Sequence, residues 1–242
     1  MNKSYSGPLG TFDYDDELWE IQHDQEGDYL SWVGAEVEVC EIPLGIKSCR
    51  KMFFCAQEDI LSFRGFNMPD DIEDMESMFA QATIPEDFSW TGFKSSNVKN
   101  FSQFFCYARI KFSGRLRIDV SNARDLSYFF CDAEILNSIS FKYGFKTEKC
   151  RDLSGLLVKA RVMDELSFGN GFIINPMAET RKMFYMDKLK GTINLGKDFD
   201  VRSLYSEEDV IDSCYSIKDY LNSSLIVPTK LEAIASDQSN FF

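Results

Sequence analysis

The most regular feature of the sequence is an apolar pattern that recurs every 25 to 27 residues. One copy spans residues 72–82, and its apolar positions are Met75, Met78, Phe79 and Ala82. This i, i+3, i+4, i+7 spacing is typical of one face of a helix. Each copy also carries a large apolar anchor at the same place, and the anchors are Phe53, Phe79, Phe105, Phe130, Leu157 and Phe184. Self-similarity at a fixed period predicts a solenoid of tandem repeats.

The polar residues of each copy favour a short helix. An Asp or Asn stands where a helix N-cap belongs, at Asp74, Asn100, Asp125 and Asp152. Such side-chain oxygens accept the free N–H groups of a first helical turn. A helix of two turns is not stable alone in water, so each is expected to need a neighbour on both sides.

Each copy is followed by two apolar residues that flank one polar residue. The pairs are Leu61/Phe63, Phe88/Trp90, Leu116/Ile118, Ile139/Phe141, Leu166/Phe168 and Ile193/Leu195. A spacing of two predicts a minimal strand with one buried face. The expected fold is an α/β repeat, a leucine-rich-repeat-like solenoid of short parallel strands and short helices.

The two ends of the chain depart from this repeat. Residues 1–45 contain three alternating segments, Leu18–Gln22, Tyr29–Val33 and Glu36–Cys40, which predict an N-terminal β cap. Residues 46–200 hold about six repeats. Residues 201–242 are expected to form a C-terminal helical cap and a polar tail, with a strand at Leu225–Val227.

The repeat resembles the BspA-like leucine-rich repeat family, which is also known from Mycoplasma surface lipoproteins. The segments 125–130, Asp-Leu-Ser-Tyr-Phe-Phe, and 152–157, Asp-Leu-Ser-Gly-Leu-Leu, are closest to its Val-x-Asp-Met-Ser-x-Met-Phe-x-x-Cys unit. The resemblance covers about residues 46–195. The helix-ending Cys of the family is Ala here, for example at Ala82 and Ala108. The resemblance implies a solenoid with no catalytic residues.

Charge and composition narrow the possible partners. Residues 1–45 hold eleven acids and one base, which is −10 of the net charge of −13 and leaves −3 for the rest. A nucleic-acid ligand is disfavoured, because phosphate binding needs a basic surface. The sequence shows neither a signal peptide nor an apolar stretch long enough to span a membrane, so we expect no membrane partner and a cytoplasmic location. The seven Cys residues then read as reduced thiols.

No residue pattern indicates catalysis. His23 is the single histidine and lies in the acidic cap, where a surface position is expected. No Ser/His/Asp triad, activated Cys or clustered metal ligands can be assembled. Cys106 and Cys131 occupy matching repeat positions and read as packing residues. We therefore expect a protein that is not an enzyme and has neither a cofactor nor a metal.

The strand residues that should point outward form the candidate binding surface, because repeat proteins commonly bind on their extended concave face. The alternative is that small hydroxyl side chains only suit a crowded sheet surface. Charged members should fix register and partner choice. The candidate residues are Ser89, Arg117, Asp119, Ser140, Lys142, Glu165, Ser167 and Asn194.

Two functions are favoured at this point, ahead of an enzyme with an unfamiliar site and of an exported structural or adhesive surface protein. The first is a protein–protein interaction module that binds a macromolecular partner through the strand face. The second is an intracellular inhibitor from a phage or mobile element, of the anti-CRISPR type, that blocks a basic, nucleic-acid-handling enzyme. Its acidic surface would include Asp13, Asp15, Asp16 and Glu17, although the same acids could serve only as a solubilising cap.

Overall fold

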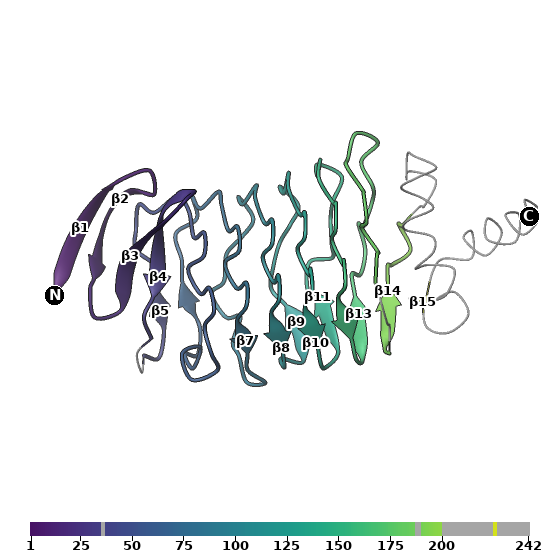
Figure 1. The fold of residues 1–242 in the computed structure, drawn as a ribbon, viewed down its shortest axis with the longest axis horizontal. Helices are drawn as coiled ribbons and strands as arrows, with labels where there is room; N and C mark the ends of the chain where they lie inside the picture. The colour runs from purple at the N-terminus through teal and green to yellow at the C-terminus, as the bar shows by residue number, and fades with distance from the viewer. Residues whose placement is uncertain (35–36, 187–189, 200–224, 227–242) are drawn as a thin grey trace, which may run out of the picture.

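The protein is a β-solenoid whose coils follow one another along its long axis, with the N-terminal hairpins at one end (Figure 1). The computed structural model describes residues 1–34, 37–186 and 190–199, together with the strand at 225–226. One column of backbone bridges joins six successive coils, through Ser48, Asp74, Asn100, Asp125, Asp152 and Glu179. The tandem-repeat solenoid predicted from the 25-to-27-residue period is confirmed.

The short helices expected in each repeat are wrong, because no helix occurs in the described part of the chain. Each expected helix is instead a run of tight turns. In the second coil Ala80 N–H donates to Ser77 O at 3.0 Å, which closes a local turn. The N–H groups of Ser77 and Phe79 donate to the next coil, to Ser102 O at 2.9 Å and Phe104 O at 3.0 Å. Successive N–H groups therefore alternate between a carbonyl of the same turn and a carbonyl of the next coil.

The backbone achieves this by entering the left-handed region twice in each of the first five coils and at Lys182 in the sixth. Such conformations cost non-glycine residues about 1–2 kcal/mol each, so the stack must compensate for them. The described left-handed positions form two columns: Lys51, Ser77, Gln103, Tyr128, Gly155 and Lys182, and Cys55, Gln81, Tyr107, Asp132 and Lys159.

The expected helix caps do form the hydrogen bond predicted for them, but they begin a turn. Asp125 Oδ1 accepts the N–H of Ser127 at 2.8 Å, and Asn100 Oδ1 accepts that of Ser102 at 3.0 Å. A side-chain oxygen that binds the N–H two residues on makes an Asx turn, which competes with a helix. The Asp and Asn positions are thus explained by turn initiation.

Two parallel sheets, one of four strands and one of five, run along the stack. One has the order β12-β10-β8-β7, and its strands directly follow the turn segments. This sheet was not predicted, because each strand has only two residues: β7 Thr83–Ile84, β8 Arg109–Ile110, β10 Glu134–Ile135 and β12 Arg161–Val162. The other sheet has the order β15-β14-β13-β11-β9, with β9 Gly114–Leu116, β11 Ile139–Phe141, β13 Glu165–Ser167, β14 Thr192–Asn194 and β15 Leu225–Ile226.

The second sheet confirms the parallel strands expected from the apolar pairs in the later repeats. In the first two repeats the paired residues are buried, but they lie outside any strand. Coils approach closely at Gly144, which has a φ of 72° and where a Cβ atom would collide with the carbonyl of Asn170. Only glycine fits there without strain.

The N-terminal end consists of antiparallel hairpins. β1 (Asn2–Gly7) pairs with β2 (Gly10–Asp15), and β3 (Trp19–Asp24) pairs with β4 (Gly27–Trp32). The alternating pattern predicted the second hairpin and missed the first. The third expected strand is reduced to β5 (Cys40–Glu41), which pairs in parallel with β6 (Phe66–Asn67). The expected C-terminal helical cap and polar tail lie outside the described residues, apart from β15.

The anchor residues stack on one another in the core. Phe53 lies on Phe79 with ring centroids 5.0 Å apart, and Phe105 lies on Phe130 at 5.5 Å, with interplanar angles of 13° and 12°. These rings are at most 1% exposed. Each buried side chain contributes about 1.5–3 kcal/mol through burial. No helix in the described residues could cross a membrane.

Candidate functional site

The outward side of the second sheet, called the strand face here, presents a regular row of polar residues. Ile139 and Phe141 are buried, and Ser140 between them is half-buried and faces outward. Ser140 pairs with Ser167 on one side, and Ser167 pairs with Asn194. These three predicted residues therefore lie side by side on adjacent strands.

At β9 the strand register differs from the one expected from the apolar pairs of the sequence. Ser140 lies opposite Arg115, and Phe141 lies opposite Leu116. Arg117 therefore lies beside Lys142. The sequence pattern places it beside Ser140, so the register differs by two residues. The sequence fits both registers, because three alternate residues here are buried: Leu116, Ile118 and Val120.

The shift gathers three cations on the strand face. Arg115, Arg117 and Lys142 are exposed, and none forms an ion pair with another described residue. The Lys142 ammonium lies 5.2 Å from the centroid of the Tyr143 ring. By contrast, Arg109 on the neighbouring sheet pairs with Glu134 at 3.2 Å. A basic patch with uncompensated charge thus stands out on a chain of net charge −13.

Other predicted members of this surface have local roles. Asp119 Oδ1 accepts the N–H of Ser121 at 3.0 Å, so this carboxylate organises a turn. Ser89 lies outside any strand, and its hydroxyl accepts the N–H of Thr91 at 3.3 Å. Glu165 is half-buried at the start of β13 and pairs in register with Thr192.

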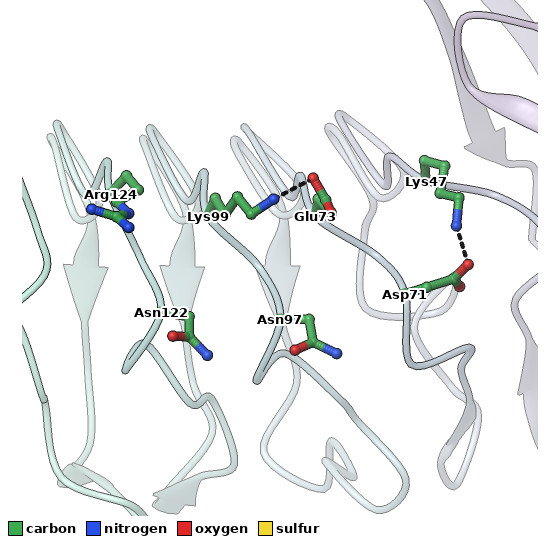
Figure 2. A pocket seen from close by; sticks show the side chains of 7 residues that line it. All are labelled: Lys47, Asp71, Glu73, Asn97, Lys99, Asn122 and Arg124. Atoms are coloured by element: carbon green, nitrogen blue, oxygen red, sulfur yellow. Dashed lines mark hydrogen bonds and ion pairs between the residues drawn. The ribbon is translucent and has the colours of Figure 1, made fainter.

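A second polar surface, called the corner groove here, lies where each coil approaches its turn segment. Figure 2 shows its side chains in repeating rows. The cavity has a volume of about 420 Å³ and is lined by Lys47, Asp71, Glu73, Asn97, Lys99, Asn122 and Arg124. Sequence reasoning missed it, although Asn-Val-Lys at 97–99 and Asn-Ala-Arg at 122–124 repeat the same spacing.

Charges in the corner groove are mostly matched. Lys99 Nζ lies 2.6 Å from Glu73 Oε2, and Lys47 pairs with Asp71 (Figure 2). The hydrogen bond from Lys47 holds the pKa of Asp71 below its usual value. Arg124 is the exception, because its exposed guanidinium has no ion pair among the described residues.

The two groove asparagines tie neighbouring coils together. Asn97 Nδ2 donates to Asp70 O at 2.7 Å, and Asn122 Nδ2 donates to Ser96 O at 2.7 Å. Asn122 Oδ1 in turn accepts from Lys149 Nζ at 2.6 Å. This part of the groove is accounted for by structural hydrogen bonds, so the strand face has the larger unmatched charge.

The four acids predicted for an inhibitor surface, Asp13, Asp15, Asp16 and Glu17, lie on or beside the first hairpin. Asp15 and Asp16 accept from the Met1 ammonium at 3.2 and 2.6 Å, and Lys3 lies 3.0 Å from Asp16. These hydrogen bonds lower the pKa of Asp16 to about 2. Asp13 accepts from the Ser4 hydroxyl at 2.6 Å, while the Glu17 side chain is 82% exposed. Within the described contacts, Asp15, Asp16 and Glu17 are thus charge-paired, the last at the longer distance of 4.0 Å from the Met1 ammonium.

A buried arginine fastens the second hairpin to the first coil, and sequence reasoning missed it. The Arg50 side chain is only 8% exposed and lies 2.6 Å from Asp24 and 3.1 Å from Glu26. Its guanidinium also lies 5.4 Å from the centroid of the Tyr29 ring. Acids of the cap therefore hold the hairpin in place, in addition to any role at the surface.

The described residues offer one histidine–carboxylate contact and no metal cluster. They contain no group of three or more His, Cys, Asp or Glu side chains that could hold a metal. His23 is exposed and lies 2.6 Å from Asp28, which also accepts from the Tyr5 hydroxyl at 2.6 Å. The His23 side chain is 71% exposed, and neither residue of this contact lines the corner groove.

These features define a tandem-repeat β-solenoid that presents rows of polar side chains. The chain belongs to the family described as Mycoplasma protein of unknown function, DUF285, whose model matches residues 73–195. That interval covers the turn segments from the second coil onward, the sheet β12-β10-β8-β7 and the strand face from β9 to β14. No significant match was found among curated proteins or among solved structures.

Proposed function

We propose that the protein is a non-enzymatic interaction module that binds a protein partner through the strand face. The observation that carries this proposal is the cluster of unpaired cations at Arg115, Arg117 and Lys142 on an otherwise acidic chain. Exposed charges of one sign keep a protein soluble, and they select and orient partners that carry the opposite charge. The partner segment is therefore expected to carry carboxylates.

The regular row beside these cations suits an extended contact. Ser140, Ser167 and Asn194 are small and lie at the spacing of adjacent parallel strands, about 4.8 Å. A partner can therefore approach the sheet closely and meet a hydroxyl or amide at every step. The energy is expected to come from many modest contacts along the stack, as is usual for repeat proteins.

We also propose that the family lies close to the BspA-like leucine-rich repeats and that this protein acts in the cytoplasm. The Asp-Leu-Ser motifs at 125–127 and 152–154 support the kinship. The six described cysteines are free, which suits a reducing compartment. Fractionation of the native cells with an antibody to the protein tests the location, and recovery in a membrane fraction would contradict it.

Affinity capture with matched variants tests the binding proposal. The test variant carries Arg115→Glu, Arg117→Glu and Lys142→Glu. The control variant makes the same change of net charge at exposed lysines elsewhere, Lys159→Glu, Lys182→Glu and Lys190→Glu. A stoichiometric partner held by the wild type and the control but lost by the test variant supports the strand face. Equal retention by all three would reject this surface, and no partner at all would reject the module.

The inhibitor function remains the second candidate. It is favoured by the excess of acids in residues 1–45, and Glu17 is exposed as it requires. It is opposed by the pairing of Asp15 and Asp16 with cations of the same hairpin. Neutralising Asp13, Asp15, Asp16 and Glu17 should abolish a steeply salt-dependent interaction if this function holds. Binding that ignores both salt and these substitutions would exclude it.

A further inference from the structure

The turn segments place two cysteines at equivalent positions of adjacent coils. Cys106 follows the anchor Phe105, and Cys131 follows the anchor Phe130. The backbone is hydrogen-bonded across the coils on both sides of Cys106, from Phe105 N–H to Phe129 O at 2.8 Å and from Tyr107 N–H to Cys131 O at 2.7 Å. Such pairing sets neighbouring chains about 4.8 Å apart. A disulfide spans Cα atoms about 4.4–6.8 Å apart, so the backbone already meets this requirement.

The side chains of this pair also meet. The two thiols are close enough for each to shift the pKa of the other, and the Cys131 thiol donates to Asp132 Oδ2 at 3.5 Å. Cys131 is half-buried, while Cys106 is 6% exposed, so a small reagent can reach the pair from the Cys131 side. The neighbouring Cys131 thiol lowers the pKa of Cys106, and Cys106 in turn raises the pKa of Cys131, so Cys106 is the thiol of the pair that ionises more readily.

The remaining described cysteines differ. Cys40, Cys49 and Cys150 are fully buried, and burial raises the pKa of Cys150 to about 12. Cys55 is exposed, but its thiol has Gln81 Oε1 as its partner at 3.4 Å. Among the described cysteines, only Cys106 and Cys131 lie close to one another and can also be reached by a small reagent.

We propose that Cys106 and Cys131 are a dithiol modification site that reacts with small-molecule disulfides. A thiolate of the pair attacks one sulfur of the reagent and releases one small thiol as the leaving group. The second cysteine then attacks the protein–reagent mixed disulfide and releases the other small thiol. The two cysteines lose two protons and two electrons and become a disulfide, while the reagent is reduced to two thiols. The new bond ties two neighbouring coils together.

The test treats the reduced full-length chain with oxidised glutathione and digests it with trypsin without reduction. Cys106 falls in the peptide 100–109 and Cys131 in the peptide 125–142, each with a single cysteine. The expected result is an intact mass lower by two hydrogen atoms and a linked pair of these peptides. Cys55→Ser should leave the link unchanged, which makes it the matched control.

Single variants and a second reagent keep the outcome decisive. Cys106→Ser should stop at a stable glutathione adduct on Cys131, because the resolving thiol is gone. Phenylarsine oxide, which bridges two close thiols, should protect both cysteines of the folded chain from alkylation and fail in either serine variant. Linkage to other cysteines, persistent mixed disulfides in the wild type, or alkylation unaffected by the arsenical would each overturn the proposal.

Discussion

At the scale of single residues, the polar column of Asp and Asn organises the coils. Each side-chain oxygen accepts the N–H two residues ahead, at 2.8 Å for Asp125 and 2.9 Å for Asp152. The same residues bridge to the neighbouring coil through their backbone. Buried or half-buried N–H groups without partners are costly, so this acceptor is needed in every coil.

We predict that Asp125→Ala lowers the free energy of unfolding by about 1 kcal/mol, because the Ser127 N–H loses its acceptor. Asp125→Asn should change it by less than about 0.5 kcal/mol, since Asn100 performs the same role in the preceding coil. Urea unfolding of the three proteins checks this order. An equal loss in both variants would mean that the charge of Asp125, rather than its hydrogen bond, matters.

At the scale of elements, the apolar spacing correctly predicted which residues are buried, but it wrongly predicted that their backbone is helical. The residues Met75, Met78 and Phe79 are all buried as a helix would bury them. A run of tight turns directs the same side chains into the core as a helix would, so the apolar pattern fits either conformation. What decides is the neighbouring coil, which offers carbonyls such as Ser102 O and Phe104 O to alternate N–H groups. No local sequence signal contains that information.

Gln103 distinguishes the two conformations experimentally. It has a φ of 57° and is exposed, and its N–H donates to Ser127 O at 2.8 Å. In a helix, Gly would cost about 1 kcal/mol and Val less. In the left-handed turn the order is reversed: we predict a change within about 0.5 kcal/mol for Gln103→Gly and a loss of about 1–2 kcal/mol for Gln103→Val. Thermal unfolding monitored by circular dichroism measures both. A Gly variant less stable than the Val variant would refute the turn conformation.

Strand prediction succeeded where packing alone determines the pattern. Ile139 and Phe141 flank an outward residue as predicted. The register of β9 was missed because the pattern Leu116, Ile118, Val120 has no unique alignment with its neighbour. The sequence places Arg115 at an outward position flanking Arg117, and the structure moves it into the row of Ser140. The corner groove was missed because its residues come from connections, where spacing carries little meaning without the coil geometry.

At the scale of the whole molecule, charge joins the N-terminal hairpins to the stack. Asp24 accepts from Lys51 Nζ at 2.6 Å and from Arg50 Nη2 at 2.6 Å. The hydrogen bond from Lys51, opposed by desolvation and helped by Arg50, lowers the pKa of Asp24. Repeat stacks need sealed ends, so this junction matters for the stability of the first coil.

The lowered pKa predicts an acid-sensitive junction. A carboxyl group whose folded pKa lies below its unfolded value of 3.8 stabilises the fold above that pH, and this contribution is lost as the pH falls through the folded pKa. Asp16, with a pKa of about 2, adds to the same trend. We expect the unfolding midpoint in urea to fall between pH 5 and pH 2, and less steeply for Asp24→Asn. A slope unchanged by Asp24→Asn would show that the junction does not depend on this ion pair.

The central claim is that the strand face binds a protein through Arg115, Arg117 and Lys142. Its most direct test is the affinity of the captured partner for the wild type, the triple glutamate variant at these positions and the matched variant at Lys159, Lys182 and Lys190. We predict that the first variant binds at least about tenfold more weakly and that the matched variant binds like the wild type. Equal affinities for all three proteins would contradict the claim.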